Sequence, residues 1–174
     1  MKQRIIILCG PDRCGKTNIA AALQKELDIK VFKASTEHDA FLNDQDRFLM
    51  DLRYADPRIC DFLRQTGVSV IFDRGFPCER VYSDFFQRKT DDQMIKKLDE
   101  QYAKMDTHII ICTRKSFDGI TDDLSDKLDC GALTKISELY MNFASWTKCK
   151  CYTLYVDDED LSREVSEIRN FLGV

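Results

Sequence analysis

The chain has 174 residues, of which 44% are hydrophobic and 32% charged, and its formal net charge is −4 at pH 7. This length fits about one domain, and the composition excludes a disordered tail, a collagen-like chain and a low-complexity linker. The acidic balance disfavours a broadly basic nucleic-acid-binding surface, although a local basic groove stays open. We therefore expect one domain over residues 1–174.

Short apolar strands alternate with amphipathic helices along the whole sequence. Apolar runs predict strands at residues 4–9, 31–32, 68–72, 108–112 and 151–156. Helical spacing of apolar residues predicts helices at residues 16–27, 41–52, 58–65, 79–88, 91–104, 133–146 and 160–172. This alternation predicts an α/β fold in which a parallel sheet is covered by helices on both faces.

None of these runs is long enough to cross a membrane, which takes about 20 apolar residues. The run at residues 5–9 follows a basic N-terminus, but it ends at Gly-Pro without a cleavage-site pattern. The eight cysteines include no Cys-x-x-Cys pair, and with two histidines they form no tetrahedral zinc pattern. We therefore expect a cytoplasmic protein with reduced thiols and no membrane partner.

The first predicted strand leads into a glycine-rich sequence that is typical of a phosphate-binding loop. Residues 10–17 match G-x-x-x-x-G-K-T between a strand and a helix. Such a loop points its amide N–H groups inward, and the helix that follows adds its positive N-terminal end. In this pattern Lys16 approaches the β- and γ-phosphates, and the Thr17 hydroxyl is a ligand of Mg²⁺. The motif predicts that a nucleoside triphosphate is bound by Gly10, Pro11, Asp12, Arg13, Cys14, Gly15, Lys16 and Thr17.

A second group of polar residues begins where the strand at residues 68–72 ends. Asp73 follows this strand and is therefore expected at the same sheet edge as the phosphate loop. There its carboxylate can hold Mg²⁺-bound water or accept a proton from an attacking hydroxyl. Arg74 is placed to contact a phosphate, although a capping aspartate beside a surface arginine is an alternative. The chain has no Asn-Lys-x-Asp motif of a GTPase and little room for motor-ATPase modules, so a small kinase fits its length.

Together these residues resemble the thymidylate kinase family in its phage-encoded form. G-x-D-R-x-G-K-T at residues 10–17 is followed by an apolar strand and D-R-x-x-P-x-E-x-V-Y-S at residues 73–83. Cys78 departs from the serine that the family usually has. The resemblance implies a three-layer P-loop kinase fold with strand order 2-3-1-4-5. It also implies an ATP- and Mg²⁺-dependent phosphotransferase that acts on a deoxypyrimidine nucleotide. Its catalytic residues would be Lys16, Arg13, Asp73 and Arg74, and its metal ligands Thr17 and Asp73.

By the same resemblance, the segment at residues 114–131 would correspond to the lid of these kinases. It contains five aspartates, and no arginine occurs between Arg114 and Arg163. Phosphoryl transfer needs positive charge over the moving group, and some thymidylate kinases place an arginine in the phosphate loop instead of the lid. Arg13 holds that loop position. A solvated Arg13 and an acidic loop without a catalytic role are the alternatives.

The resemblance further implies an acceptor pocket and a donor-nucleotide site. For the acceptor it suggests Arg53 as a phosphate clamp, Tyr54 and Phe76 as stacking rings, and Tyr82 as a contact to sugar or base. Arg53 is equally well explained as a surface charge. Arg114 and the acidic pair at residues 157–158 would fall near the donor nucleotide, although acids there also suit a helix N-terminus.

The nature of the acceptor stays open at this level. A free deoxypyrimidine nucleotide is the default of the family. Some phage relatives instead phosphorylate 5-hydroxymethyluracil within DNA during base hypermodification, with the base flipped out of the stack. A non-catalytic nucleotide-binding switch is a third possibility. A homodimer is also possible through the apolar face of Val81, Phe85 and Phe86, which suits a buried core equally well.

Overall fold

The computed structural model describes residues 3–33, 51–120 and 128–174. Within these residues one parallel sheet is formed by the strands β1 (Ile5–Cys9), β2 (Val31–Lys33), β3 (Val70–Asp73), β4 (Thr107–Thr113) and β5 (Lys150–Tyr155). Their order is β2-β3-β1-β4-β5, which confirms the order implied by the resemblance. Parallel neighbours require crossover connections, and helices supply them.

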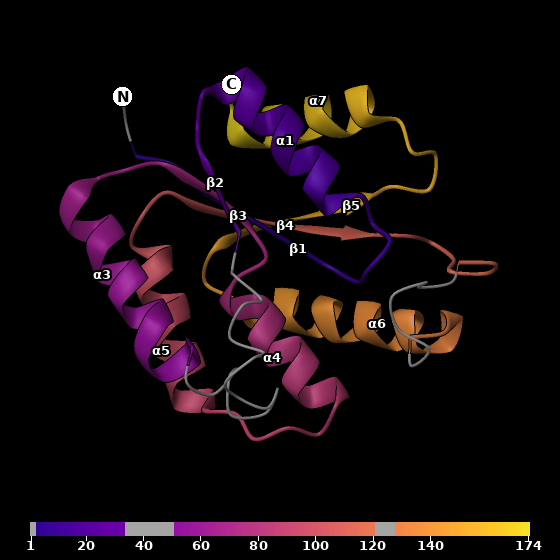
Figure 1. Ribbon diagram of the computed structural model, residues 1–174, viewed down its shortest axis with the longest axis horizontal. Coiled ribbons are helices and arrows are strands. Elements are labelled where there is room, and N and C mark those ends of the chain that lie inside the picture. The colour runs from indigo at the N-terminus through magenta and orange to yellow at the C-terminus, as the bar shows by residue number, and fades with distance from the viewer. Residues whose placement is uncertain (1–2, 34–50, 121–127) are drawn as a thin grey trace.

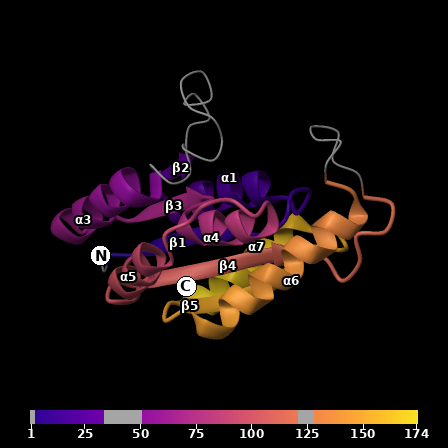
Figure 2. The ribbon, with the colours of Figure 1, turned by 90° about the horizontal axis from the view of Figure 1, so that it is seen from below.

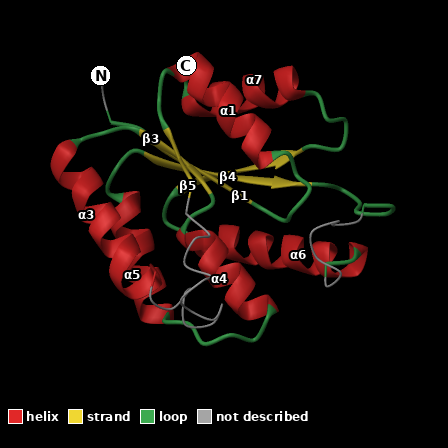
Figure 3. Cartoon of the chain, in the orientation of Figure 1, coloured by secondary structure: helices red, strands yellow, loops and turns green. Residues whose placement is uncertain are grey.

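Helices cover both faces of this sheet, as Figures 1 and 2 show. The described helices are α1 (Lys16–Leu27), the π-helix η2 (Asp51–Ala55), α3 (Asp56–Thr66), α4 (Phe76–Phe85), α5 (Asp92–Ala103), α6 (Cys130–Trp146) and α7 (Leu161–Leu172). Helices α1 and α7 pack together on one face, and α4, α5 and α6 lie on the other, with α3 beside α5 (Figure 3). None of the helices described is long and apolar enough to span a bilayer.

The central strands are buried because helices cover both sides of them. Every residue of β1, β3 and β4 is buried, in agreement with the apolar runs that predicted these strands, and the burial extends to the polar residues at the ends of β3 and β4. The two edge strands are more exposed: Phe32 in β2 keeps 45% and Tyr155 in β5 keeps 44% of its surface. The core therefore runs along β1, β3 and β4, and the carboxyl ends of these three strands meet at one edge.

Helix ends differ from the sequence-based expectation where a capping residue lies outside the apolar pattern. Helix α6 begins at Cys130 rather than at residue 133, because the Asp129 side chain accepts a hydrogen bond from the Ala132 amide at 2.8 Å. Helix α4 begins at Phe76, with a proline in its first turn, rather than at residue 79. The helix expected at residues 41–52 lies almost wholly outside the described residues.

Candidate active site

The phosphate loop follows β1 and lies tightly against the end of β4. Gly10 has φ +131°, and a Cβ atom there would lie 1.9 Å from the carbonyl oxygen of Cys112. Arg13 and Gly15 have φ values of 62° and 63°, in the left-handed region. Successive residues that include left-handed ones can turn backbone N–H groups toward one centre, which makes an anion-binding concavity. The backbone of residues 10–15 is therefore consistent with the phosphate cradle that the motif predicts.

Three of the predicted residues meet at the carboxyl edge of the sheet. The register pairs Leu8 of β1 with Asp73 of β3, which brings Asp73 beside the loop. The Thr17 hydroxyl donates a hydrogen bond to Asp73 Oδ2 at 2.9 Å, and Lys33 Nζ lies 3.7 Å from the same oxygen. Lys16 is only 6% exposed, and its Nζ donates to the carbonyl of Pro11, across the base of the loop.

A hydroxyl and a carboxylate in this arrangement fit Mg²⁺ in kind and number. Mg²⁺ prefers oxygen ligands and is usually held by one or two carboxylates together with phosphate oxygens and water. Among the described residues, no three His, Cys, Asp or Glu side chains form a cluster that could hold a metal by themselves. Thr17 and Asp73 would therefore bind the cation as part of a nucleotide complex rather than as a closed protein site.

Asp12 links the phosphate loop to the Asp-Arg motif and to α4. Its carboxylate is paired with the Arg74 guanidinium and accepts a hydrogen bond from the Tyr82 hydroxyl at 3.3 Å. The Arg74 guanidinium also lies 5.9 Å from the centre of the Tyr82 ring. Burial raises the pKa of Asp12, but the charges of Arg74 and Lys16 outweigh it and hold that pKa below its usual value.

Arg74 is held in an unusual backbone conformation within this cluster. Its φ is 77°, which side-chain-bearing residues rarely adopt, and its amide donates to the Leu8 carbonyl at 2.9 Å. Its side chain is 40% exposed, so the guanidinium stays within reach of a ligand. Such conformations persist where the surrounding structure fixes them, and they cluster at binding sites.

A cavity of about 530 Å³ opens on the other side of the loop. Its walls come from the loop, from α1, from the segment after β4 and from the connection between β5 and α7. The lining residues are Arg13, Gly15, Asn18, Arg114, Gly119, Ile120, Val156, Glu159, Leu161 and Glu164. The sequence pattern indicated only Arg13, Gly15 and Arg114 of these.

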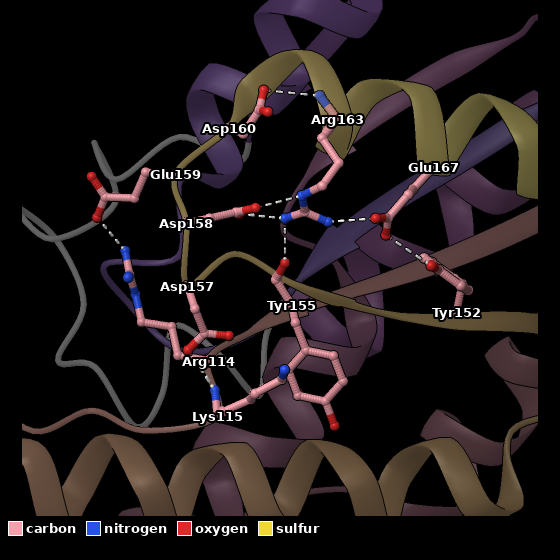
Figure 4. Close-up of polar contacts among 10 residues, drawn as sticks. All are labelled: Arg114, Lys115, Tyr152, Tyr155, Asp157, Asp158, Glu159, Asp160, Arg163 and Glu167. Carbon is pink, nitrogen blue, oxygen red and sulfur yellow. Dashed lines mark hydrogen bonds and ion pairs between the residues drawn. The ribbon is translucent and has the colours of Figure 1, made fainter.

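Arg114 joins two walls of this cavity, and Figure 4 shows its ion pair with Glu159. Its Nε donates to the carbonyl of Arg13 at 3.2 Å, and its guanidinium forms an ion pair with Glu159 at 2.7 Å. The Arg114 side chain is only 10% exposed, whereas that of Glu159 is 72% exposed. Arg114 thus supports the backbone of Arg13, whose own side chain is exposed at the cavity.

The connection between β5 and α7 is held by a polar network, which Figure 4 shows. Arg163 donates to both carboxylate oxygens of Asp158, at 2.8 and 2.6 Å, and to the carbonyl of Tyr155 at 2.7 Å. The Asp157 carboxylate accepts a hydrogen bond from the Lys115 amide at 2.9 Å. The acidic pair at residues 157–158 therefore shapes one wall of the cavity through its hydrogen bonds to the chain itself.

The four predicted acceptor residues have different surroundings. Arg53 donates from Nε to Asp91, the N-cap of α5, at 3.2 Å, and Tyr54 is 53% exposed. Tyr82 is buried and bonded to the loop through its hydroxyl. Phe76 is only 2% exposed and stacks on a neighbouring core ring, with centroids 5.2 Å apart. The structure therefore places Phe76 in the core rather than at a surface where a base could stack.

Two further predictions concern the rest of the phosphate loop and the lid-like segment. Cys14 is buried, and burial raises the pKa of its thiol to about 11.

Of the segment at residues 114–131, residues 121–127 lie outside the described part of the chain. Phe117 and Leu128, which flank this gap, are buried at 3% and 6% exposure. The described ends of the acidic segment are thus attached to the core.

The apolar face of α4 is divided between core and surface. Val81 is buried, Phe85 is half-buried and Phe86, which ends the helix, is 41% exposed. The rings of Phe85 and Phe86 pack edge to face at 4.9 Å. Dimer formation through this face stays a prediction.

The sheet order and the loop define the fold of the P-loop nucleotide kinases, and solved structures share it. The YorR protein from Bacillus subtilis, solved with phosphorylated GDP, is similar with a TM-score of 0.71 and 20% identity, over 97% of this chain and 95% of that one. Thymidylate kinase from Ehrlichia chaffeensis gives 0.67 at 14% identity, over 99% and 100% of the two chains. Deoxyadenosine kinase from M. mycoides with bound dATP gives 0.62 at 15% identity, over 98% and 99%.

These structures share the fold with this chain at low sequence identity. No protein-family model matches the sequence, and no curated protein matches it. The comparisons therefore establish the fold, and the function must be argued from the site.

Proposed function

We propose that the chain is an ATP- and Mg²⁺-dependent phosphotransferase, similar to thymidylate kinases, that phosphorylates a deoxypyrimidine nucleotide. One observation carries this proposal. Lys16 and Thr17, at the end of the phosphate-loop motif, and Asp73, at the end of β3, lie together at the carboxyl edge of the sheet. Phosphoryl transfer depends mainly on positioning and on charge stabilisation, and this edge supplies both. The names of the similar kinases agree with this class of reaction.

The residues of the loop would hold the donor. Backbone amides of residues 10–15 and the N-terminal end of α1 bind phosphate oxygens, and Lys16 places its charge beside the β- and γ-phosphates. Arg13 is exposed at the cavity, where its guanidinium can neutralise the equatorial oxygens of the moving group. Thr17 and Asp73 would hold Mg²⁺, which neutralises charge on the β- and γ-phosphate oxygens when bound.

The cluster of Asp12, Arg74 and Tyr82 would face the acceptor. Arg74 offers a reachable guanidinium on the side of the loop opposite to the donor cavity, and Asp12 and Tyr82 fix its orientation. An arginine suits a phosphate because its planar fork of donors matches phosphate oxygens. Arg53 is a second candidate, since its partner among the described residues is Asp91, in an exposed ion pair that can open.

A transfer assay with γ-labelled ATP and Mg²⁺ tests both the reaction and the acceptor. Thymidylate is offered in one tube and hydroxymethyluracil-containing DNA in another. We expect label on thymidylate. Label within the DNA base would overturn the free-nucleotide acceptor and would favour a role in DNA modification. Label in neither acceptor, with ATP bound, would favour a non-catalytic nucleotide-binding protein.

A further inference from the structure

The cavity beside the phosphate loop has two ends of different chemistry. At one end Arg13, Gly15 and Asn18 present the loop and the first turn of α1, where phosphates would lie. At the other end the lining comes from Val156, which is 2% exposed, and from the first turn of α7. An apolar wall of this kind suits the flat face of a base.

Glu164 is the unexpected residue at the second end. It lies in the first turn of α7, lines the cavity and is only 4% exposed. Within the described part of the chain no group donates a hydrogen bond to its carboxylate, whereas Glu159 pairs with Arg114 and Glu167 with Arg163. Its carboxylate oxygens are not among the fully buried polar atoms without a partner, so they reach the cavity, where a bound molecule can donate to them.

The helix itself does not require an acid at this position. Asp160 already caps α7, since its side chain accepts a hydrogen bond from the Arg163 amide at 3.1 Å. An exposed acid in the first turn would serve the helix dipole equally well, without the penalty of burial. The position of Glu164 is therefore better explained by the cavity than by the helix.

We propose that Glu164 reads the base of the phosphate donor by accepting a hydrogen bond from the 6-amino group of adenine. This inference rests on the proposed function, and it adds a residue that selects the donor. A carboxylate oxygen accepts hydrogen bonds, so it attracts the amino group at position 6 of adenine. It repels the carbonyl oxygen that inosine carries at the same position.

The groups around Glu164 shift the pKa of its carboxyl. Burial raises the pKa of Glu164, Asp158 and Asp160 raise it further, and the opposing effects of Arg163 and Arg114 do not cancel this. The carboxylate could also accept from N1–H and the 2-amino group of guanine, so GTP is the decisive competitor.

The test is equilibrium binding of labelled ATP, ITP and GTP, with Mg²⁺ and without acceptor, to three proteins. Wild type should bind ATP at least roughly tenfold more tightly than ITP, because hydrogen bonds to charged groups are among the stronger ones. Glu164→Gln should lower this ratio to about twofold or less, because an amide can accept from an amino group or donate to a carbonyl. Glu167→Gln, on the same helix but bonded to Arg163 and Tyr152, should keep the wild-type ratio.

The outcomes separate this inference from the proposed function. An unchanged ratio in Glu164→Gln, or tighter binding of GTP than of ATP by wild type, would overturn the role of Glu164. In both cases phosphoryl transfer to thymidylate could persist, so the proposed function would stand. Failure of every triphosphate to bind the folded wild type would overturn both.

Discussion

Replacing Gly10 with alanine should destabilise the protein strongly, because the phosphate loop touches the backbone of β4 there. The new Cβ would lie 1.9 Å from the Cys112 carbonyl oxygen and 2.9 Å from its carbon, so the loop or the strand must shift. Forcing extra atoms into a packed region costs about 1–3 kcal/mol. Adopting φ +131° adds about 1–3 kcal/mol for a residue with a side chain. We expect the free energy of unfolding to fall by about 2–6 kcal/mol.

Gly67→Ala is the matched control for this prediction. Gly67 also has a positive φ, +66°, but nothing lies within 4 Å of the added Cβ, so only backbone strain of about 1–2 kcal/mol is expected. Urea unfolding followed by circular dichroism gives both free energies. Equal destabilisation in the two variants would refute the close approach of the loop to β4. Binding of ATP should weaken only in Gly10→Ala.

The remaining predictions concern charge, thiols and a buried carboxylate. Asp12→Asn should lose about 0.5–1 kcal/mol, since the pair with Arg74 is partly exposed. Burial opposes the shift, yet the pKa of Asp12 is lowered. The Asp12 carboxylate therefore contributes fully to the free energy of unfolding above pH 3.8, and this contribution is lost as the pH falls through the lower pKa of the folded state. Urea unfolding at several pH values should show that the difference between Asp12→Asn and wild type vanishes in acid. A thiol reagent at pH 8 should react with the exposed Cys130 in a fast phase and with the buried Cys14 much more slowly. If the fast phase of labelling persisted in Cys130→Ser, this prediction would be contradicted. Asp99→Ala should lose about 1–2 kcal/mol in urea unfolding, because two part-buried hydrogen-bond donors after α6 lose their buried acceptor, and a loss below about 0.5 kcal/mol would contradict this.

Features that depend on neighbouring residues in the sequence could be predicted well. The motif at residues 10–17 is contiguous. Helix α1 occupies residues 16–27, as its apolar spacing predicts, and Asp28 follows it as the C-cap with φ 50°. β1 is apolar throughout and β4 is apolar over residues 109–112, because both faces of these strands are covered. Asp73 was expected at the sheet edge because the carboxyl ends of parallel strands meet there, and its hydrogen bond with Thr17 agrees.

Features that depend on distant segments could not be predicted in the same way. Glu159 pairs with Arg114, 45 residues earlier, only because β4 and β5 are neighbours in register. Glu164 reaches the cavity because α7 packs on α1, and nothing in its local sequence distinguishes it from a surface acid. Phe76 was expected to stack on the acceptor base, but the turn after Gly75 directs it into the core.

The central claim is tested most directly by phosphoryl transfer from γ-labelled ATP to thymidylate, compared between wild type and Lys16→Ala. Circular dichroism of both proteins shows whether the fold is kept. We predict that wild type labels thymidylate and that Lys16→Ala, with an unchanged spectrum, loses this turnover, because the charge beside the β- and γ-phosphates is gone. Turnover by Lys16→Ala at the wild-type rate would contradict the account.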